Sequence, residues 1–204
     1  MYKFIGLAMM GIFAMMVIPG NFDSASGEPN FYGAATIQKL DAMGNEVFAQ
    51  TVHNKLTNTG EDFILDQTFQ DTVESVADNI SIGAICVSQA TIPADPEAHT
   101  AAAFDTANTL DDQDVCEEDT TVTTSGSIAT IGGLIFASGA DNVDNGDTIA
   151  TIGICQNDVT DDNAFASCAG EGILFAIVDV SDTTLASGET VNITYTFDIT
   201  SASS

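Results

Sequence analysis

The chain has 204 residues, with 30 Asp and Glu against only three Lys and no Arg, so its formal net charge is −27. Binding to nucleic acids or to anionic lipid surfaces depends on clustered Lys and Arg, so this composition argues against both kinds of partner. Hydrophobic residues make up 45% of the chain and charged residues 16%, which is too apolar for a typical disordered protein.

The N-terminus has the layout of a secretory signal peptide. A basic start ending at Lys3 precedes an apolar run over residues 4–18, which Pro19–Gly20 closes. This run is shorter than the about 20 residues that a spanning helix needs, although a retained anchor is the alternative. We therefore expect residues 1–27 to be a signal peptide and residues 28–204 to be a single β-sandwich domain, located outside the cell or on its surface.

The first part of this domain is predicted to form a hairpin and then a helix. A turn-rich segment, Asp41–Asn45, separates two β-prone runs at residues 31–40 and 46–54. Residues 57–62 then offer several helix-capping side chains ahead of an apolar stretch. This pattern predicts one short helix over residues 60–70.

The rest of the chain alternates β-prone runs with Asp, Asn and Gly clusters, which is typical of strands and turns. The clearest strand is the last, where apolar residues alternate with polar ones from Val191 to Ile199. The sequence thus predicts an all-β fold, a β-sandwich or jelly roll of about eight strands with one inserted helix. The other predicted strands are 79–88, 120–124, 127–137, 148–156 and 172–180.

All four cysteines lie in the predicted secreted domain. An even number of cysteines in an exported chain indicates two disulfides, and three pairings are open. We favour Cys86–Cys116 and Cys155–Cys168, because each bridge would join a long polar loop to the strand that it leaves.

One acidic loop, residues 141–147, suggests a metal site. It fails as an EF-hand because Val143 and Ile152 occupy ligand positions. A looser site formed by Asp141, Asp144 and Asp147 remains, and Ca²⁺ is the one cofactor that the sequence suggests. The alternative is a turn in which these side chains cap their own backbone.

Two Asn-x-Ser/Thr triplets, at Asn79 and Asn192, are candidate glycosylation sites. Asn192 belongs to the polar face of the last predicted strand, so we expect its side chain to point outward. By contrast, His53 and His99 lie in no nucleophile-elbow or metal-box context. We therefore expect no catalytic residues and no enzyme activity.

Two segments resemble a known group of proteins. Residues 53–64, HNKLTNTGEDFI, resemble the pattern HN-x-LTN-x-G-x-DFI, and residues 174–176 and 188–197 resemble an LFA … GDTLTVTYTF ending. Both patterns are similar to those of β-sandwich structural proteins of tailed viruses and of related archaeal extracellular filament and surface proteins. The resemblance implies a capped helix, a closing strand and a role in assembly. The signal peptide departs from virion proteins and favours a cell-surface role.

The leading functional hypothesis is a secreted structural subunit of a filament, pilus-like fibre or surface layer, whose partner is further copies of itself. The alternatives are a virion tail or capsid protein and a calcium-dependent adhesin or binding module. Strand donation by residues 28–38 would build the polymer, with Phe31 or Tyr32 and Ile37 filling pockets. The competing interpretation is that residues 31–38 form a hairpin with 46–54 in their own domain.

Overall fold

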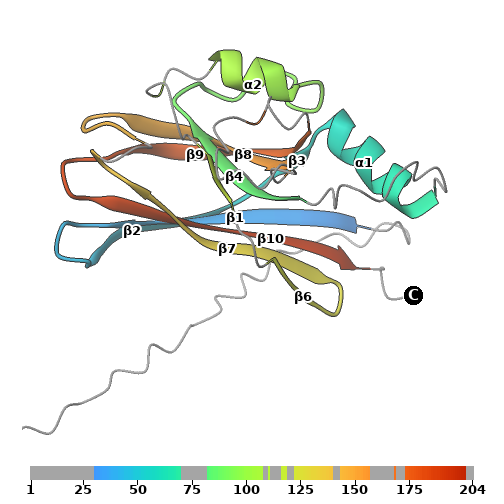
Figure 1. The fold of residues 1–204 in the computed structure, drawn as a ribbon, viewed down its shortest axis with the longest axis horizontal. Coiled ribbons are helices and arrows are strands. Elements are labelled where there is room, and N and C mark those ends of the chain that lie inside the picture. The colour runs from blue at the N-terminus through green and yellow to red at the C-terminus, as the bar shows by residue number, and fades with distance from the viewer. Residues whose placement is uncertain are drawn as a thin grey trace, which may run out of the picture.

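The computed structural model describes two antiparallel β-sheets packed face to face, with two helices (Figure 1). The residues that it describes are 30–69, 82–107, 110, 116–118, 122–139, 143–156, 168 and 173–200. The strands are β1 (Asn30–Leu40), β2 (Glu46–His53), β3 (Lys55–Leu56), β4 (Ile82–Ser88), β5 (Cys116–Glu118), β6 (Thr123–Ser125), β7 (Ile128–Ala137), β8 (Thr148–Gln156), β9 (Leu174–Thr184) and β10 (Thr190–Thr200). The helices are α1 (Asn58–Phe69) and α2 (Ala101–Ala107).

Each sheet has five strands. Sheet A has the order β2-β1-β10-β7-β6, and sheet B has the order β3-β9-β8-β4-β5. The chain passes from sheet A to sheet B at Asn54, between β2 and β3. α2 covers the face of sheet B that points away from sheet A, and α1 packs on β9 (Figure 1).

The core lies between the two sheets, and β10 shows how the sequence builds it. Val191, Ile193 and Tyr195 are buried, while the residues between them are half-buried on the outer face. The predicted alternation is confirmed over this part of the strand. It ends at Ile199, which is 47% exposed because the buried face stops before the end of β10.

The predicted sandwich is confirmed, with differences in detail. The described residues contain ten strands rather than about eight, and they contain a second helix, α2, that the sequence analysis missed. α1 begins at Asn58, two residues before the predicted start, because the Thr57 hydroxyl accepts the N–H of Gly60 at 3.1 Å and caps the helix there. Among the described residues, no helix is long and apolar enough to cross a membrane.

The structure places the predicted donor strand, β1, within the sheet of its own domain. β1 pairs with β10 from Asn30 to Leu40, a range that includes Phe31 and Tyr32, and with β2 from Ala34 to Leu40. Ile37 is fully buried in the core of its own domain. Residues 34–38 of the segment predicted for donation therefore have both hydrogen-bonding edges occupied within their own domain, and the structure contains the hairpin of the competing interpretation. Donation of this segment to another copy stays a prediction. The predicted signal peptide, residues 1–27, lies outside the described residues.

Lys39, at the end of β1, joins three parts of the fold. Its Nζ donates to the Thr184 carbonyl at 2.8 Å and forms an ion pair with Glu189 Oε2 at 2.7 Å. The hydrogen bond from Lys39, together with that from the Ala186 N–H, lowers the pKa of Glu189 below its ordinary value. Both side chains are less than one fifth exposed, at 19% and 17%, so the pair is only partly screened by solvent.

Replacing Lys39 by methionine is expected to lower the free energy of unfolding by about 1–2 kcal/mol at pH 7. Because the pKa of Glu189 is lowered by folding, its contribution is complete above the ordinary glutamate pKa of 4.5 and is lost as the pH falls through the lowered pKa. Urea denaturation at pH 7 and under acid conditions measures this difference. Equal stability of Lys39→Met and the wild type at pH 7 would contradict the expectation.

Candidate assembly surface

Within the described part of the chain, the two sheets end in four edge strands, and one of these is much longer than the others. β2 and β6 are the edges of sheet A, and β3 and β5 are the edges of sheet B. β2 has 8 residues, whereas β6, β3 and β5 have 3, 2 and 3. Exposed edge strands carry unpaired N–H and C=O groups that can accept a strand of another chain. β2 is therefore the edge best suited to such an addition.

Contacts at both ends hold β2 in place. At its start, the Asp41 carboxylate accepts the N–H groups of Met43 and Asn45, each at 2.9 Å, and Gly44 adopts the positive φ of 81° that the turn requires. At its end, the Asn54 N–H donates to the Gly33 carbonyl at 3.0 Å. The hairpin therefore presents β2 as an ordered strand.

The main-chain groups of β2 point alternately toward β1 and away from it. Because the Asn54 N–H bonds to β1, Val52 and Gln50 also direct their N–H and C=O groups to that strand. Those of Ala49 and Thr51 consequently point to the open side, where no described strand pairs with β2. These groups are the hydrogen-bonding positions that an added strand would use.

The side chains of β2 do not protect this edge. The strand has the sequence EVFAQTVH, and Glu46 at its start is its one Asp, Glu, Lys or Arg residue. Natural proteins commonly place charges or proline on edge strands to prevent pairing with other chains. The seven residues from Val47 to His53 contain neither, nor any glycine. The other edge strand of sheet A, β6, also lacks charged residues but has only 3 residues.

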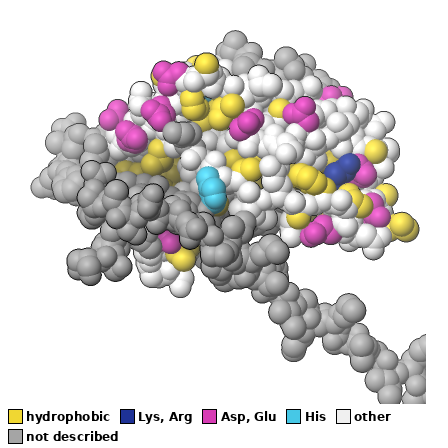
Figure 2. Space-filling model, turned by 180° about the vertical axis from the view of Figure 1, so that it is seen from behind, with side chains coloured by type: hydrophobic (Ala, Val, Ile, Leu, Met, Phe, Trp, Pro, Cys, Tyr) yellow, Lys and Arg dark blue, Asp and Glu magenta, His cyan; other side chains and the backbone are white. Residues whose placement is uncertain are grey.

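The two faces of β2 differ in polarity. Phe48 and Val52 are half-buried and pack against the core, and Gln50 Oε1 accepts the Ser181 N–H of β9 at 2.9 Å. Ala49 and Thr51 are exposed on the outer face. β2 lies at the back of the molecule in Figure 1, and Figure 2 views this side, where hydrophobic side chains form a band with most acidic side chains above and below it.

The outer face of sheet A is also poor in charge. Its outward side chains are mostly Thr, Ala, Gln and Asn, and the hydroxyls of Thr36 and Thr51 lie 3.0 Å apart. Among the described residues, acidic groups occur only at its margins, at Glu46 and Asp198. The members of this face are Ala34, Thr36, Gln38, Ala49, Thr51, His53, Thr123, Thr130, Ile135, Asn192, Thr194 and Thr196.

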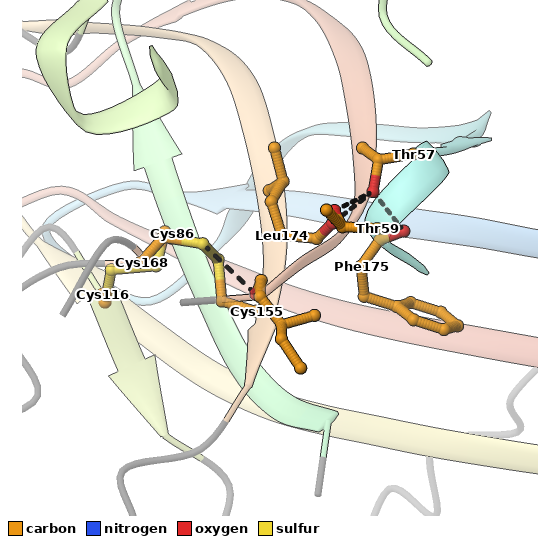
Figure 3. The surroundings of a disulfide bond; sticks show 9 residues. Thr57, Thr59, Cys86, Cys116, Cys155, Cys168, Leu174 and Phe175 are labelled. Atoms are coloured by element: carbon orange, nitrogen blue, oxygen red, sulfur yellow. Dashed lines mark hydrogen bonds between the residues drawn. A yellow bond between two sulfur atoms is a disulfide. The ribbon is translucent and has the colours of Figure 1, made fainter. Parts of the chain in front are cut away.

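Both disulfides have the pairing that the sequence analysis favoured, Cys86–Cys116 and Cys155–Cys168. Cys86 and Cys116 are directly opposite each other on β4 and β5. Cys155 lies on β8, and the sulfur atoms of Cys86, Cys155 and Cys168 all lie within 4.8 Å of one another (Figure 3). The two bridges therefore lie next to each other and are buried against sheet B. They are on the far side of the sandwich from the outer face of sheet A.

The predicted calcium site is only partly described. The Asp144 N–H donates to Asp147 Oδ2 at 3.3 Å, and the Asp147 N–H donates to the Asp144 carbonyl at 3.1 Å. Asp147 thus caps its own turn, as in the alternative interpretation. Asp141 lies outside the described residues, so the three-carboxylate site stays a prediction.

Of the two candidate glycosylation sites, the structure describes Asn192. Asn79 lies outside the described residues. Asn192 is on the outer face of sheet A, as expected, but it is half-buried and its Oδ1 is buried without a hydrogen-bond partner. It lies between Gln38 of β1 and Ile135 of β7, so it is less accessible than the sequence analysis expected.

The sequence analysis assigned Phe31, Tyr32 and Ile37 of β1 to assembly and did not single out β2. A scan against protein-family models, a search of the curated proteins and a search of the solved structures find no match. No signal in the sequence singles out β2, because residues 79–88, 127–137 and 148–156 are uncharged β-prone runs as well. Chemically, this surface offers main-chain hydrogen bonds and apolar contacts, the interactions used in strand addition.

Proposed function

We propose that the protein is a secreted structural subunit of an extracellular filament, pilus-like fibre or surface layer, and that it assembles with copies of itself at the edge of β2. The observation that carries the proposal is β2 itself, an eight-residue edge strand with one charged residue. The signal-peptide pattern of residues 1–27 and the resemblance to surface and virion structural proteins support the same class of function.

The net charge supports a second copy as the partner at this edge. Two chains of charge −27 repel each other, and that repulsion is smallest where neither surface carries carboxylates. β2 beyond Glu46 and the adjoining outer face of sheet A meet that condition. Since the Debye length is about 8 Å at physiological ionic strength and about 3 Å in molar salt, assembly should strengthen as salt is added.

A matched pair of variants tests the role of β2. Ala49→Glu places a carboxylate on the exposed edge of sheet A, and Thr124→Glu places one on its opposite edge, β6. Both variants change the net charge equally, so they differ only in where the charge lies. Because every copy carries the new carboxylate, pairing two β2 edges brings two like charges close together across the strand pair, which costs up to about 1 kcal/mol.

We expect Ala49→Glu to raise the concentration needed for assembly by about tenfold or more, with Thr124→Glu close to the wild type. Sedimentation velocity and negative-stain electron microscopy at several salt concentrations measure this. Equal loss of assembly in both variants would remove β2 as the assembly edge. A wild type that stays monomeric at all concentrations and salts would overturn the proposed function.

A virion structural protein would use the same kind of contact, and the resemblance of residues 53–64 favours it as a second candidate. N-terminal sequencing of protein isolated from its natural source distinguishes the two. A start near Glu28 supports export, and an intact Met1 in particles supports the virion.

A further inference from the structure

We propose that β2 pairs with β2 of a second copy, antiparallel and about a two-fold axis that passes beside Gln50. This inference rests on the proposed function and adds the identity of the strand that β2 accepts, its direction and its register. The observations that carry it are the sequence of β2, the face of the sheet to which each of its side chains points, and the edge along which no described strand pairs with it.

The sidedness of β2 restricts the registers that are available. In an antiparallel pair, residues directly opposite each other project their side chains to the same face. A two-fold axis perpendicular to the sheet places the outer face of one copy beside the outer face of the other. Ala49 or Thr51 must therefore oppose an outer-face residue, and Phe48, Gln50 or Val52 must oppose a core-facing one.

The main-chain groups of β2 that face away from β1 lead to the same restriction on the register. The open edge presents the N–H and C=O groups of Ala49 and Thr51. When Ala49 lies opposite Thr51 of the second copy, the two residues form a hydrogen-bonded pair, in which both N–H groups and both C=O groups have partners. Both the side chains and the backbone therefore require an axis that passes beside a residue and not through the midpoint between two residues. Centring on Phe48 places Glu46 opposite Gln50, and centring on Val52 pairs only residues 51–53, so the registers that remain are those centred on Ala49, Gln50 or Thr51.

Side-chain matching selects one of these three registers. With Gln50 at the centre, Phe48 opposes Val52 of the second copy, and Glu46 falls outside the paired segment. Centring on Ala49 instead places Phe48 opposite Gln50 and Glu46 opposite Val52. Centring on Thr51 shortens the paired segment and places Gln50 opposite Val52. Of the three registers, only the one centred on Gln50 places the apolar Phe48 opposite an apolar residue, Val52, and keeps the Glu46 carboxylate out of the contact.

The contact joins two five-stranded sheets into one continuous sheet of ten strands. It also joins the two outer faces of sheet A, so that the carboxylate-poor surface doubles in extent. A two-fold contact closes on itself as a dimer and does not propagate. The dimer is therefore the building unit, and a filament or layer forms from such dimers through a second contact elsewhere on the surface. This differs from the head-to-tail chain expected from strand donation by residues 28–38.

Cysteine pairing tests the register directly. Ala49→Cys and Thr51→Cys place thiols on the exposed outer face, away from the buried native bridges. Directly opposite residues of a hydrogen-bonded pair have Cα atoms about 5.5 Å apart, which suits a disulfide. Under mild oxidation, an equimolar mixture of the two variants should give a cross-linked dimer on a non-reducing gel, and each variant alone should give little or none.

The outcomes separate this inference from the proposed function, provided that assembly of the same samples is followed by sedimentation. Cross-linking of Ala49→Cys alone or of Thr51→Cys alone, exceeding that of the mixture, would overturn the register while leaving β2 as the assembly edge. Assembly without cross-linking in any sample would overturn the two-fold pairing of β2. Monomers in all samples, including the unmodified wild type, would overturn both proposals.

Discussion

Replacing Gly60 by alanine is expected to destabilise the protein by about 3 kcal/mol or more, or to prevent folding. Within an exposed helix the same change normally stabilises by up to about 1 kcal/mol, so the two cases differ in sign. Gly60 lies in the first turn of α1 and is buried. A Cβ at this position would overlap the carbonyl oxygen of Phe175 and lie 2.9 Å from its carbonyl carbon.

The surroundings of Gly60 leave the helix no room to move away. The Thr57 N–H donates to the Phe175 carbonyl at 3.1 Å, and the Thr57 hydroxyl donates to the carbonyls of Leu174 and Phe175 (Figure 3). The Thr59 hydroxyl also donates to Leu174, at 2.9 Å. These bonds lock the start of α1 onto β9, and the obstacle is backbone rather than a flexible side chain.

Asp62→Ala is the matched control, because Asp62 lies in the same helix but is exposed. Its expected effect on the free energy of unfolding lies within about 0.5 kcal/mol. Thermal and urea denaturation of both variants measure the contrast. If Gly60→Ala proves as stable as the wild type, the close packing of α1 on β9 is wrong.

Removing either disulfide is expected to cost a large part of the stability of a domain of this size, typically 5–15 kcal/mol. Cys86–Cys116 closes a sequence separation of 30, and Cys155–Cys168 one of 13. In the chain-entropy account these loops correspond to about 4 and about 3 kcal/mol. The paired variants Cys86→Ala/Cys116→Ala and Cys155→Ala/Cys168→Ala should therefore both be less stable, and the first more so.

Melting with and without a thiol reductant gives the same test on the unmodified chain. Because all four cysteines are at most 4% exposed, reduction should require partial unfolding and should be slow below the melting temperature. Peptide mapping without reduction should show no free thiol. An unchanged melting temperature after complete reduction would contradict a stabilising role for the bridges.

Local patterns in the sequence predict much of the fold. The alternation from Val191 onward indicates β10, and the Asp41–Asn45 segment indicates the first hairpin, because each signal lies within a few consecutive residues. α2 was missed because residues 101–107 carry no helical apolar periodicity. The helix is held by tertiary contact instead: Phe104 is 2% exposed and packs over Gly153, where a Cβ would lie 3.0 Å from the Phe104 ring.

The candidate site was harder to predict than the fold, because a strand's neighbours are set by distant parts of the chain. β1 is interior only because β10, at the other end of the domain, pairs along its whole length from Asn30 to Leu40. That pairing turns β2 into the edge strand of sheet A. The sequence of β1 alone is compatible with either a donated strand or an interior one, so local pattern could not decide between them.

Hydrogen–deuterium exchange on assembled and dissociated wild-type protein tests the central claim most directly. If β2 forms the contact between copies, the amides of Ala49 and Thr51 should exchange rapidly in the monomer and become protected in the assembly. β6, the opposite edge of sheet A, should exchange equally in both states. Assembled protein whose β2 amides exchange as fast as those of the monomer would contradict the account.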